Sequence, residues 1–180
     1  VKKKSKSFVN KFFNKVFIIN LDDQQHRLKA ITKRLSKINV NFTRFKAIDG
    51  RCKTPSECTK KRKYYQKKYK VKIPKSIDMP PASLTLGTMV ILKKMVKHKW
   101  KRILIMEDDA TFVRNFDKRF EKGIKELDEV APTWDLLYLG CTQYCGVKGI
   151  SLKKTNKNKH KTSINKFSKK ANWYVKHKDD

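Results

Sequence analysis

Hydrophobic and polar positions follow first a strand-like and then a helix-like period in the first fifty residues. Residues 16–19 form a short β-branched and aromatic run, which predicts a strand buried on both faces. Apolar residues then recur at helical spacing over 28–38, and we expect Asp22 or Asp23 to cap this helix. Residues 40–48 alternate as in a second strand and end in an Asp-Gly turn. This order of elements predicts an α/β domain with a mostly parallel sheet flanked by helices.

In the second half of the chain, helix-like and strand-like patterns alternate again. An apolar stripe at helical spacing covers residues 84–96, and Ser83 is its expected cap. Residues 103–106 form another short apolar run that is typical of a buried strand. A helix with several acids is expected over 112–130, followed by a strand over 136–139.

Composition shifts along the chain suggest its organisation. We expect residues 1–15 to be a basic flexible arm and 16–150 to be the α/β domain, with 51–81 as a basic insertion. Residues 151–180 are expected to hold a Lys/Asn-rich loop and a final strand. The chain does not begin with Met, and we expect it to be a fragment of a longer protein.

The strong positive charge has two interpretations. The chain of 180 residues carries 46 Lys plus Arg against 16 Asp plus Glu, a formal net charge of +30, and 38 of those basic residues are Lys. Nucleic-acid readers rely on Arg for bidentate contacts, so the Lys bias favours a solvated surface over a dedicated polyanion groove. A non-specific, salt-sensitive affinity for nucleic acid is expected in either case.

The basic stretch 60–70 within the insertion has the same two interpretations, a solvated surface or a nucleic-acid-binding site. Its three tyrosines, Tyr64, Tyr65 and Tyr69, interleave with lysines and could stack on bases while the lysines hold phosphates. The interpretation that we favour is a solvated insertion whose tyrosines pack on the domain.

The apolar pattern and the cysteines bear on the cellular compartment of the chain. No run of about 18 apolar residues is present, so no membrane span is expected, and no signal peptide is visible. On this basis the cytoplasm is favoured, with the secretory lumen possible if the N-terminus was trimmed. Cys52, Cys58, Cys141 and Cys145 contain no C-x-x-C pair, which disfavours a zinc site. We expect ordinary thiols, and the redox compartment stays open.

Three consecutive acids, Glu107, Asp108 and Asp109, follow the apolar run 103–106. Acids at the carboxyl end of a strand lie where α/β sheets bind ligands, and hard carboxylate oxygens suit Mg²⁺ or Mn²⁺ carried with a diphosphate. The competing interpretation is that Asp108 or Asp109 caps a helix that begins near Thr111. Spacing alone favours the cap.

Four ordered segments resemble glycosyltransferase family 25, the group of lipopolysaccharide-type galactosyltransferases and procollagen galactosyltransferase-like proteins. The segments are residues 16–21 (VFIINL) with Arg27 downstream, 47–50 (AIDG), 103–109 (ILIMEDD) and 134–140 (WDLLYLG).

This resemblance implies a GT-A-like, Rossmann-related fold and a metal-dependent transfer of galactose or glucose from a UDP-sugar to a hydroxyl of a glycan or protein. It implies Mn²⁺ (or Mg²⁺) held by Asp109 and Glu107, and catalytic roles for Asp109 and Asp108. The implied donor-binding residues are Asn20, Leu21, Arg27, Asp49, Gly50 and Glu107. The alternative is an inactive GT-A-like domain that acts as a basic RNA-binding or partner-binding module.

Two departures from the family pattern bear on activity. Gly87-Thr88 stands where the family has Ser-His, and His98 is expected to be a solvent-facing residue at a helix end. No Gly-Thr-His-Ala-Tyr-like strand follows the acidic triplet. The catalytic base is therefore not placed, and Asp135 is a candidate only by its position at the start of a strand.

Overall fold

The computed structural model describes residues 6–139 and 174–176, and the chain forms two compact units, residues 1–117 and 118–180. The first unit contains, in order, α1 (Phe8–Phe12), β1 (Lys15–Asn20), α2 (Gln25–Lys37), β2 (Thr43–Lys46), α3 (Pro55–Tyr69), α4 (Met79–Lys97) and β3 (Ile103–Glu107). Helix α5 (Phe116–Val130) starts at the end of the first unit, and the second unit also holds β4 (Leu136–Tyr138) and β5 (Tyr174–Lys176).

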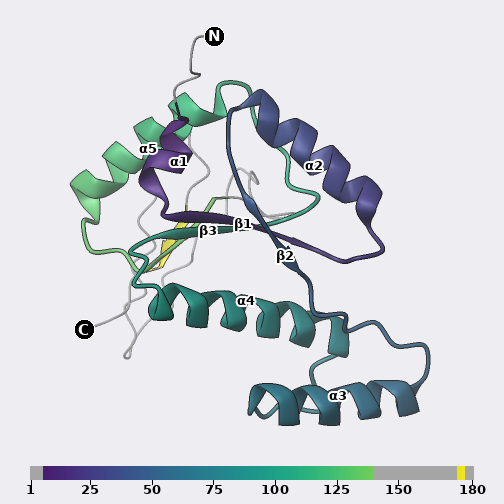
Figure 1. Cartoon of the computed structure of the whole chain (residues 1–180). Coiled ribbons are helices and arrows are strands. Elements are labelled where there is room, and N and C mark those ends of the chain that lie inside the picture. Colours follow the sequence, from purple (N-terminus) through teal and green to yellow (C-terminus); the bar gives the residue numbers. More distant parts are fainter. Residues whose placement is uncertain (1–5, 140–173, 177–180) are drawn as a thin grey trace, which may run out of the picture. The chain divides into compact units, whose positions relative to one another are not determined.

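The first unit is built on a parallel sheet with the strand order β2-β1-β3. In the register of the sheet, Ile18 lies opposite Arg44 on one side and Met106 on the other. Helices α2 and α4 cover opposite faces of this sheet (Figure 1). The predicted α/β architecture, a parallel sheet flanked by helices, is confirmed. In the second unit β4 and β5 pair antiparallel as a separate two-stranded sheet.

The central strand β1 is buried on both faces, as its sequence predicts. Phe17 and Ile19 pack with Ile91 of α4 in one hydrophobic cluster. Ile18 points to the opposite face and is fully buried. Because side chains alternate along a strand, Asn20 is the next residue on that opposite face. The alternation therefore carries a polar side chain into the buried layer at the end of the strand.

Both predicted helix caps are wrong. Helix α2 begins at Gln25, and neither Asp22 nor Asp23 caps it, because both carboxylates bind arginines from the next segment of the chain. Helix α4 begins at Met79 instead of after Ser83, which lies inside the helix with its hydroxyl donating to the Met79 carbonyl at 2.7 Å. A proline in the first turn of α4 suits that start, because its missing N–H is one that has no partner within the helix.

Part of the segment expected to be a flexible arm is ordered. The Ser7 hydroxyl accepts from the Asn10 amide and caps α1, and Val9 is buried. The Asp117 carboxylate accepts from the amides of Phe8 at 2.8 Å and Val9 at 3.1 Å. A negative carboxylate that binds the first N–H groups of a helix is stabilising, and it fixes this segment to the unit.

The basic insertion contains helix α3, which packs by two of its three tyrosines. Tyr65 and Tyr69 lie against a buried cluster that includes Ile73 and Leu86, whereas Tyr64 is 57% exposed. The packed interpretation is therefore confirmed for Tyr65 and Tyr69.

Cys52 and Cys58 form a disulfide at the start of α3, with their Cα atoms 5.3 Å apart. The expectation of ordinary thiols is wrong for this pair. A spacing of five intervening residues says little by itself, and the two side chains meet because the chain turns into the first turn of α3 between them. Cys141 and Cys145 lie outside the described residues.

Within the described ranges, none of the helices has the length and apolar character needed to cross a bilayer.

Candidate functional site

Polar side chains gather at one edge of the parallel sheet, because its three strands all end there. Strand β1 ends in Asn20, β2 in Lys46 and β3 in Glu107. Ligands of open α/β sheets bind beyond the carboxyl ends of the strands. The residues that follow these three ends form the candidate site.

Asn20 and Asp108 form a buried pair at the centre of this edge. Asn20 is 1% exposed and Asp108 is 6% exposed, and Asn20 Nδ2 donates to Asp108 Oδ2 at 2.7 Å. The same amide nitrogen donates to the Gln24 carbonyl at 3.1 Å, and Oδ1 accepts from Arg44 Nε at 2.9 Å. Both N–H groups of the Asn20 amide are thus engaged, and one of them fixes an oxygen of Asp108 in place.

Arg27, in the first turn of α2, bridges two members of the acidic triplet. Its Nη2 lies 2.7 Å from Asp108 Oδ1 and 2.7 Å from Asp109 Oδ2. The Asp108 side chain is 8% exposed and that of Asp109 is 67% exposed. The helix-cap interpretation of these acids is wrong, because the next helix begins at Phe116, several residues beyond Thr111. The structure instead ties them to α2 through a guanidinium.

Glu107, the last residue of β3, is exposed next to this bridge. Its pKa is raised, first because neighbouring atoms reduce the hydration of its carboxyl and then because Asp109 and Asp108 are negative; Arg27 opposes the shift. Within the described ranges, no group of three or more His, Cys, Asp or Glu side chains is arranged to bind a metal. Two exposed carboxylates, Glu107 and Asp109, nevertheless fit Mn²⁺ or Mg²⁺, which commonly use one or two carboxylates together with substrate phosphates.

Arg44, on β2, extends the cluster toward the loop after β1. Its Nη2 donates to Asp22 Oδ1 at 2.6 Å, and Lys46 pairs with the other oxygen of that carboxylate. Both contacts lower the pKa of Asp22, with the Lys46 hydrogen bond as the larger cause. Sequence reasoning missed Arg44, since nothing in an alternating strand pattern marks one polar residue as the partner of a buried amide.

Arg51 joins the loops after β1 and β2. Its guanidinium donates to both oxygens of Asp49 at 2.9 Å and to Asp23 Oδ2 at 2.8 Å. These hydrogen bonds lower the pKa of Asp49 to about 2 and also lower that of Asp23. Arg51 was also missed, although it directly follows the Asp-Gly turn that the family resemblance singled out.

Gly50 packs closely on the start of α4. A Cβ atom at this position would lie 2.1 Å from the Ser83 hydroxyl and 2.2 Å from the Met79 carbonyl oxygen. The close approach gives Gly50 a packing role. Leu21 is half-buried, and its carbonyl accepts from the Gln24 amide at 3.1 Å. Donor-binding roles for these two residues stay predictions.

The two remaining candidates lie away from this cluster or in the other unit. His98 is the exposed C-terminal cap residue of α4, as expected, and its ring stacks on Trp100 at 4.8 Å. Asp135 is exposed and belongs to the second unit. Its role as the base stays a prediction.

The sequence profile described as "Glycosyltransferase family 25 (LPS biosynthesis protein)" matches residues 13–178, which include every strand of the parallel sheet. The chain belongs to glycosyltransferase family 25. The resemblance drawn from the four motifs is therefore confirmed.

Curated family 25 proteins are similar over most of this chain. Procollagen galactosyltransferase 2 of Mus musculus is 22% identical over 137 residues, which cover 71% of this chain and 21% of that protein. Procollagen galactosyltransferase 1-B of Xenopus laevis is 25% identical over 132 residues, with coverages of 71% and 21%. A protein of Rattus norvegicus named "Probable inactive glycosyltransferase 25 family member 3" is 26% identical over 139 residues, with coverages of 73% and 23%. The chain spans about a fifth of the length of these relatives.

Proposed function

We propose that this chain carries the donor site of a hexosyltransferase, which uses a UDP-sugar such as UDP-galactose or UDP-glucose and a hydroxyl acceptor on a glycan or protein. The observation that supports it is the Asn20–Asp108–Arg27–Asp109 cluster at the carboxyl end of the sheet in a family 25 chain. Together with the neighbouring Glu107, the cluster presents one guanidinium and two exposed carboxylates, those of Glu107 and Asp109, at the place where an α/β sheet binds nucleotides.

Each residue of the cluster has a distinct part in this proposal. Glu107 and Asp109 would hold Mn²⁺ or Mg²⁺ through their exposed oxygens, and Arg27 would meet the donor diphosphate as a bidentate donor. The bound cation would supply neutralisation of the charge that develops on the departing diphosphate. Asp108 is buried and held at both oxygens, so we assign it a positioning role in place of the catalytic role that the resemblance implied.

The loop after β2 completes the donor pocket in this proposal. Asp49 and Gly50, together with Leu21, would line it from the side of β1 and β2, and Arg51 would set the position of the Asp49 carboxylate. No residue is assigned as the catalytic base that would accept the proton of the acceptor hydroxyl.

Thermal unfolding with Mn²⁺ and UDP tests the donor site directly, without requiring transfer by a chain that spans a fifth of its relatives. We expect Mn²⁺ plus UDP to raise the Tm of the wild-type chain and Asp109→Asn to abolish the shift. Asp128→Asn, a matched loss of one exposed carboxylate on α5, is expected to keep it. If wild-type Tm does not respond to any UDP-sugar with Mn²⁺ or Mg²⁺, the chain resembles the relatives named inactive and the proposal is wrong.

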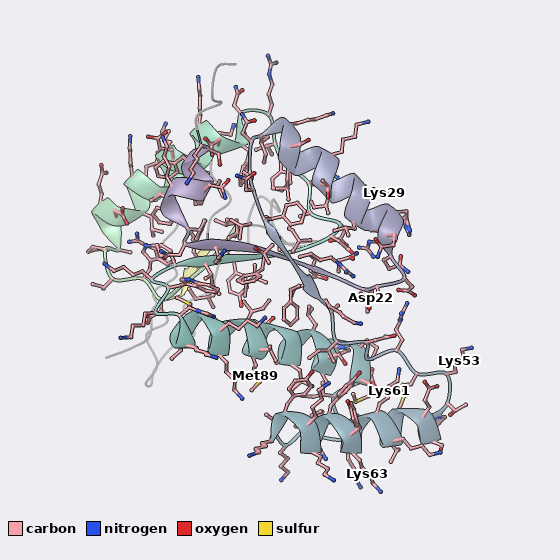
Figure 2. All side chains as sticks on the ribbon, viewed as in Figure 1. Asp22, Lys29, Lys53, Lys61, Lys63 and Met89 are labelled. Carbon is pink, nitrogen blue, oxygen red and sulfur yellow. A yellow bond between two sulfur atoms is a disulfide. The ribbon has the colours of Figure 1, made fainter. Side chains whose placement is uncertain are left out.

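The second candidate function, a basic binding module, is favoured by the surface of α3. Lys60, Lys63 and Lys67 follow one another at helical spacing beside the exposed ring of Tyr64. Lys63 extends from the side of α3 that faces away from α4 (Figure 2). Such an interleaved surface can hold a polyanion such as single-stranded RNA.

A matched pair of triple variants tests this second candidate. Changing the three α3 lysines to Gln should weaken binding of a poly(U) RNA and flatten its salt dependence, because fewer counterions are released. The control changes Lys29, Lys33 and Lys37, three exposed lysines spaced along α2, and removes the same charge. Equal losses in both variants would mean that the net charge, and not α3, attracts the RNA.

The disulfide bears on the compartment. Disulfides persist in oxidising compartments and are rare in the cytosol, so we propose the secretory lumen in place of the cytoplasm favoured by the sequence. The test is the thiol content of the protein isolated from its own cells under alkylation. Full labelling of Cys52 and Cys58 would contradict it.

A further inference from the structure

We propose that Arg27 is a built-in counter-cation, which neutralises Asp108 and Asp109 in the donor-free protein and exchanges Asp109 for the donor diphosphate when donor and divalent cation bind. This inference rests on the proposed donor site. In this proposal the Arg27 side chain stabilises the donor-free site and also contributes to the binding of the donor.

The three consecutive acids create the need for such a group. Like charges at adjacent positions repel, and burying a carboxylate as deeply as that of Asp108 is costly unless a cation is paired with it. Arg27 supplies it from another element, across 82 residues of sequence to Asp109. The free protein therefore has a cation at its acidic edge without any bound metal.

The two contacts of Arg27 differ in how easily they can be exchanged. The contact with Asp108 is shielded, since that side chain is 8% exposed and Asn20 holds its other oxygen. The contact with Asp109 is made in solvent, where that side chain is 67% exposed and an ion pair contributes little. Asp109 can thus be released while Asp108 keeps Arg27 at the site.

The guanidinium also has donors to offer to a second ligand. Both contacts are made through Nη2, and among the described residues no other side chain forms a hydrogen bond or ion pair with Arg27, although its charge also acts on Glu107. A guanidinium carries five N–H donors in a planar fork, which suits two oxygens of a phosphate. Each of the two double-donor edges of a guanidinium includes Nη2, so release of Asp109 frees one Nη2 hydrogen. Together with the hydrogen of Nε or Nη1 on the same edge, it can bind two oxygens of a diphosphate while Asp108 keeps the other Nη2 hydrogen.

The exchange predicts opposite effects of one substitution on two ligands. In Arg27→Met, Asp109 has no cation to release, so Mn²⁺ alone should bind about two- to fivefold more tightly. UDP in the presence of saturating Mn²⁺ should bind about tenfold or more weakly, because a charge-assisted contact is lost. The Tm of the ligand-free protein should fall, since Asp108 loses its cation.

Two further variants separate the exchange from other causes. Arg34→Met removes a guanidinium from the same helix, where Nη1 donates to the carbonyl of Ala110 in the loop after the acids. If simple loss of nearby charge explains the effects, Arg34→Met will reproduce them; we expect it to change both affinities less than twofold. Arg27→Lys keeps the charge and the fold but lacks the fork, so Mn²⁺ affinity should stay near wild type while UDP affinity falls.

The measurements are the loss of the free aqueous Mn²⁺ signal in electron paramagnetic resonance and calorimetric titration of UDP at saturating Mn²⁺, both on the full chain. Opposite signs for Mn²⁺ and UDP in Arg27→Met support the exchange. Weaker binding of both ligands, or unchanged UDP binding, overturns it while leaving the donor site intact if the wild type binds both. A wild type that binds neither ligand overturns the donor site and the exchange together.

Discussion

Replacing Asn20 by Asp tests whether the buried amide holds Asp108 in place. The substitution keeps the size of the side chain but puts an oxygen where Nδ2 now donates, 2.7 Å from Asp108 Oδ2. At an effective dielectric constant of about 20, two full charges at this separation repel by about 6 kcal/mol. Because protonating one of them is less costly, we expect the folded protein to keep one proton on the pair.

The proton sets the magnitude of the effect and its pH dependence. Keeping a proton at pH 7 on a carboxyl whose unfolded pKa is about 3.9 costs about 4 kcal/mol. The pKa of the pair is raised in the folded state, so stability is highest below the unfolded pKa and falls by about 1.4 kcal/mol per pH unit up to neutrality. Arg44, which now donates to Oδ1 of residue 20 at 2.9 Å, would offset part of the repulsion, so about 4 kcal/mol is an upper value.

Urea unfolding at about pH 5 and about pH 7 checks this prediction, with the unfolded pKa of Asp as the reference. Asn20→Leu is the comparison, because it removes the hydrogen bonds that Nδ2 donates, together with the one that Oδ1 accepts from Arg44, but adds no ionisable group. We expect it to lose about 2–4 kcal/mol at both pH values, whereas the loss in Asn20→Asp should be much larger at the higher pH. Equal losses in Asn20→Asp at the two pH values would refute the reasoning, since they would mean that residue 20 does not face a carboxylate.

Three other predictions concern the surroundings of the site. Gly50→Ala should lower the free energy of unfolding by about 1–3 kcal/mol, because its Cβ would lie 2.2 Å from the carbonyl oxygen of the first residue of α4; Gly87→Ala, whose Cβ would lie 3.4 Å from an aromatic ring, should be much milder in the same urea titration. Reduction of the Cys52–Cys58 disulfide should lower the free energy of unfolding by about 2 kcal/mol, and the double Ser variant should show the same loss without dithiothreitol. The pKa of Asp49 is lowered to about 2, so the stabilisation that this carboxylate gives the folded state is present above its unfolded pKa and lost as pH falls from about 4 toward 2. Asp49→Asn should therefore reduce the fall of Tm between these pH values. A fall of Tm equal to that of the wild type would contradict the pairing of Asp49 with Arg51.

The sheet could be predicted from sequence because its signal is local. Residues 16–19 and 103–106 are apolar runs too short for helices, and they form β1 and β3 side by side. The helix starts were mispredicted because a cap was assigned to each nearby Asp or Ser. Asp22 instead binds Arg44, 22 residues away, and a local rule does not include such a partner.

The site could be predicted only in part, for a related reason. The acidic triplet is a local feature at a strand end, and the family resemblance drew attention to Asn20 and Arg27. That Arg27 meets Asp108 and Asp109 depends on the parallel alignment of β1 with β3 and on the entry of α2 over that edge. Hydrophobic periodicity predicts the strands and helices. It does not predict which charged side chain near the end of one strand binds which side chain near the end of another.

The pairing of the edge carboxylates bears on how a basic chain could discriminate between anions. Asp22, Asp23 and Asp49 bind Arg44 or Arg51, much as Arg27 binds the acids after β3. With a net charge of +30, the chain attracts any polyanion, so attraction alone gives no selectivity for a nucleotide-sugar. Selectivity at this edge requires a ligand that satisfies the guanidinium groups and also supplies a cation for the carboxylates that they release. A diphosphate carried with a divalent cation meets both requirements, whereas a bare polyanion would leave the released carboxylates unpaired beside its own charge.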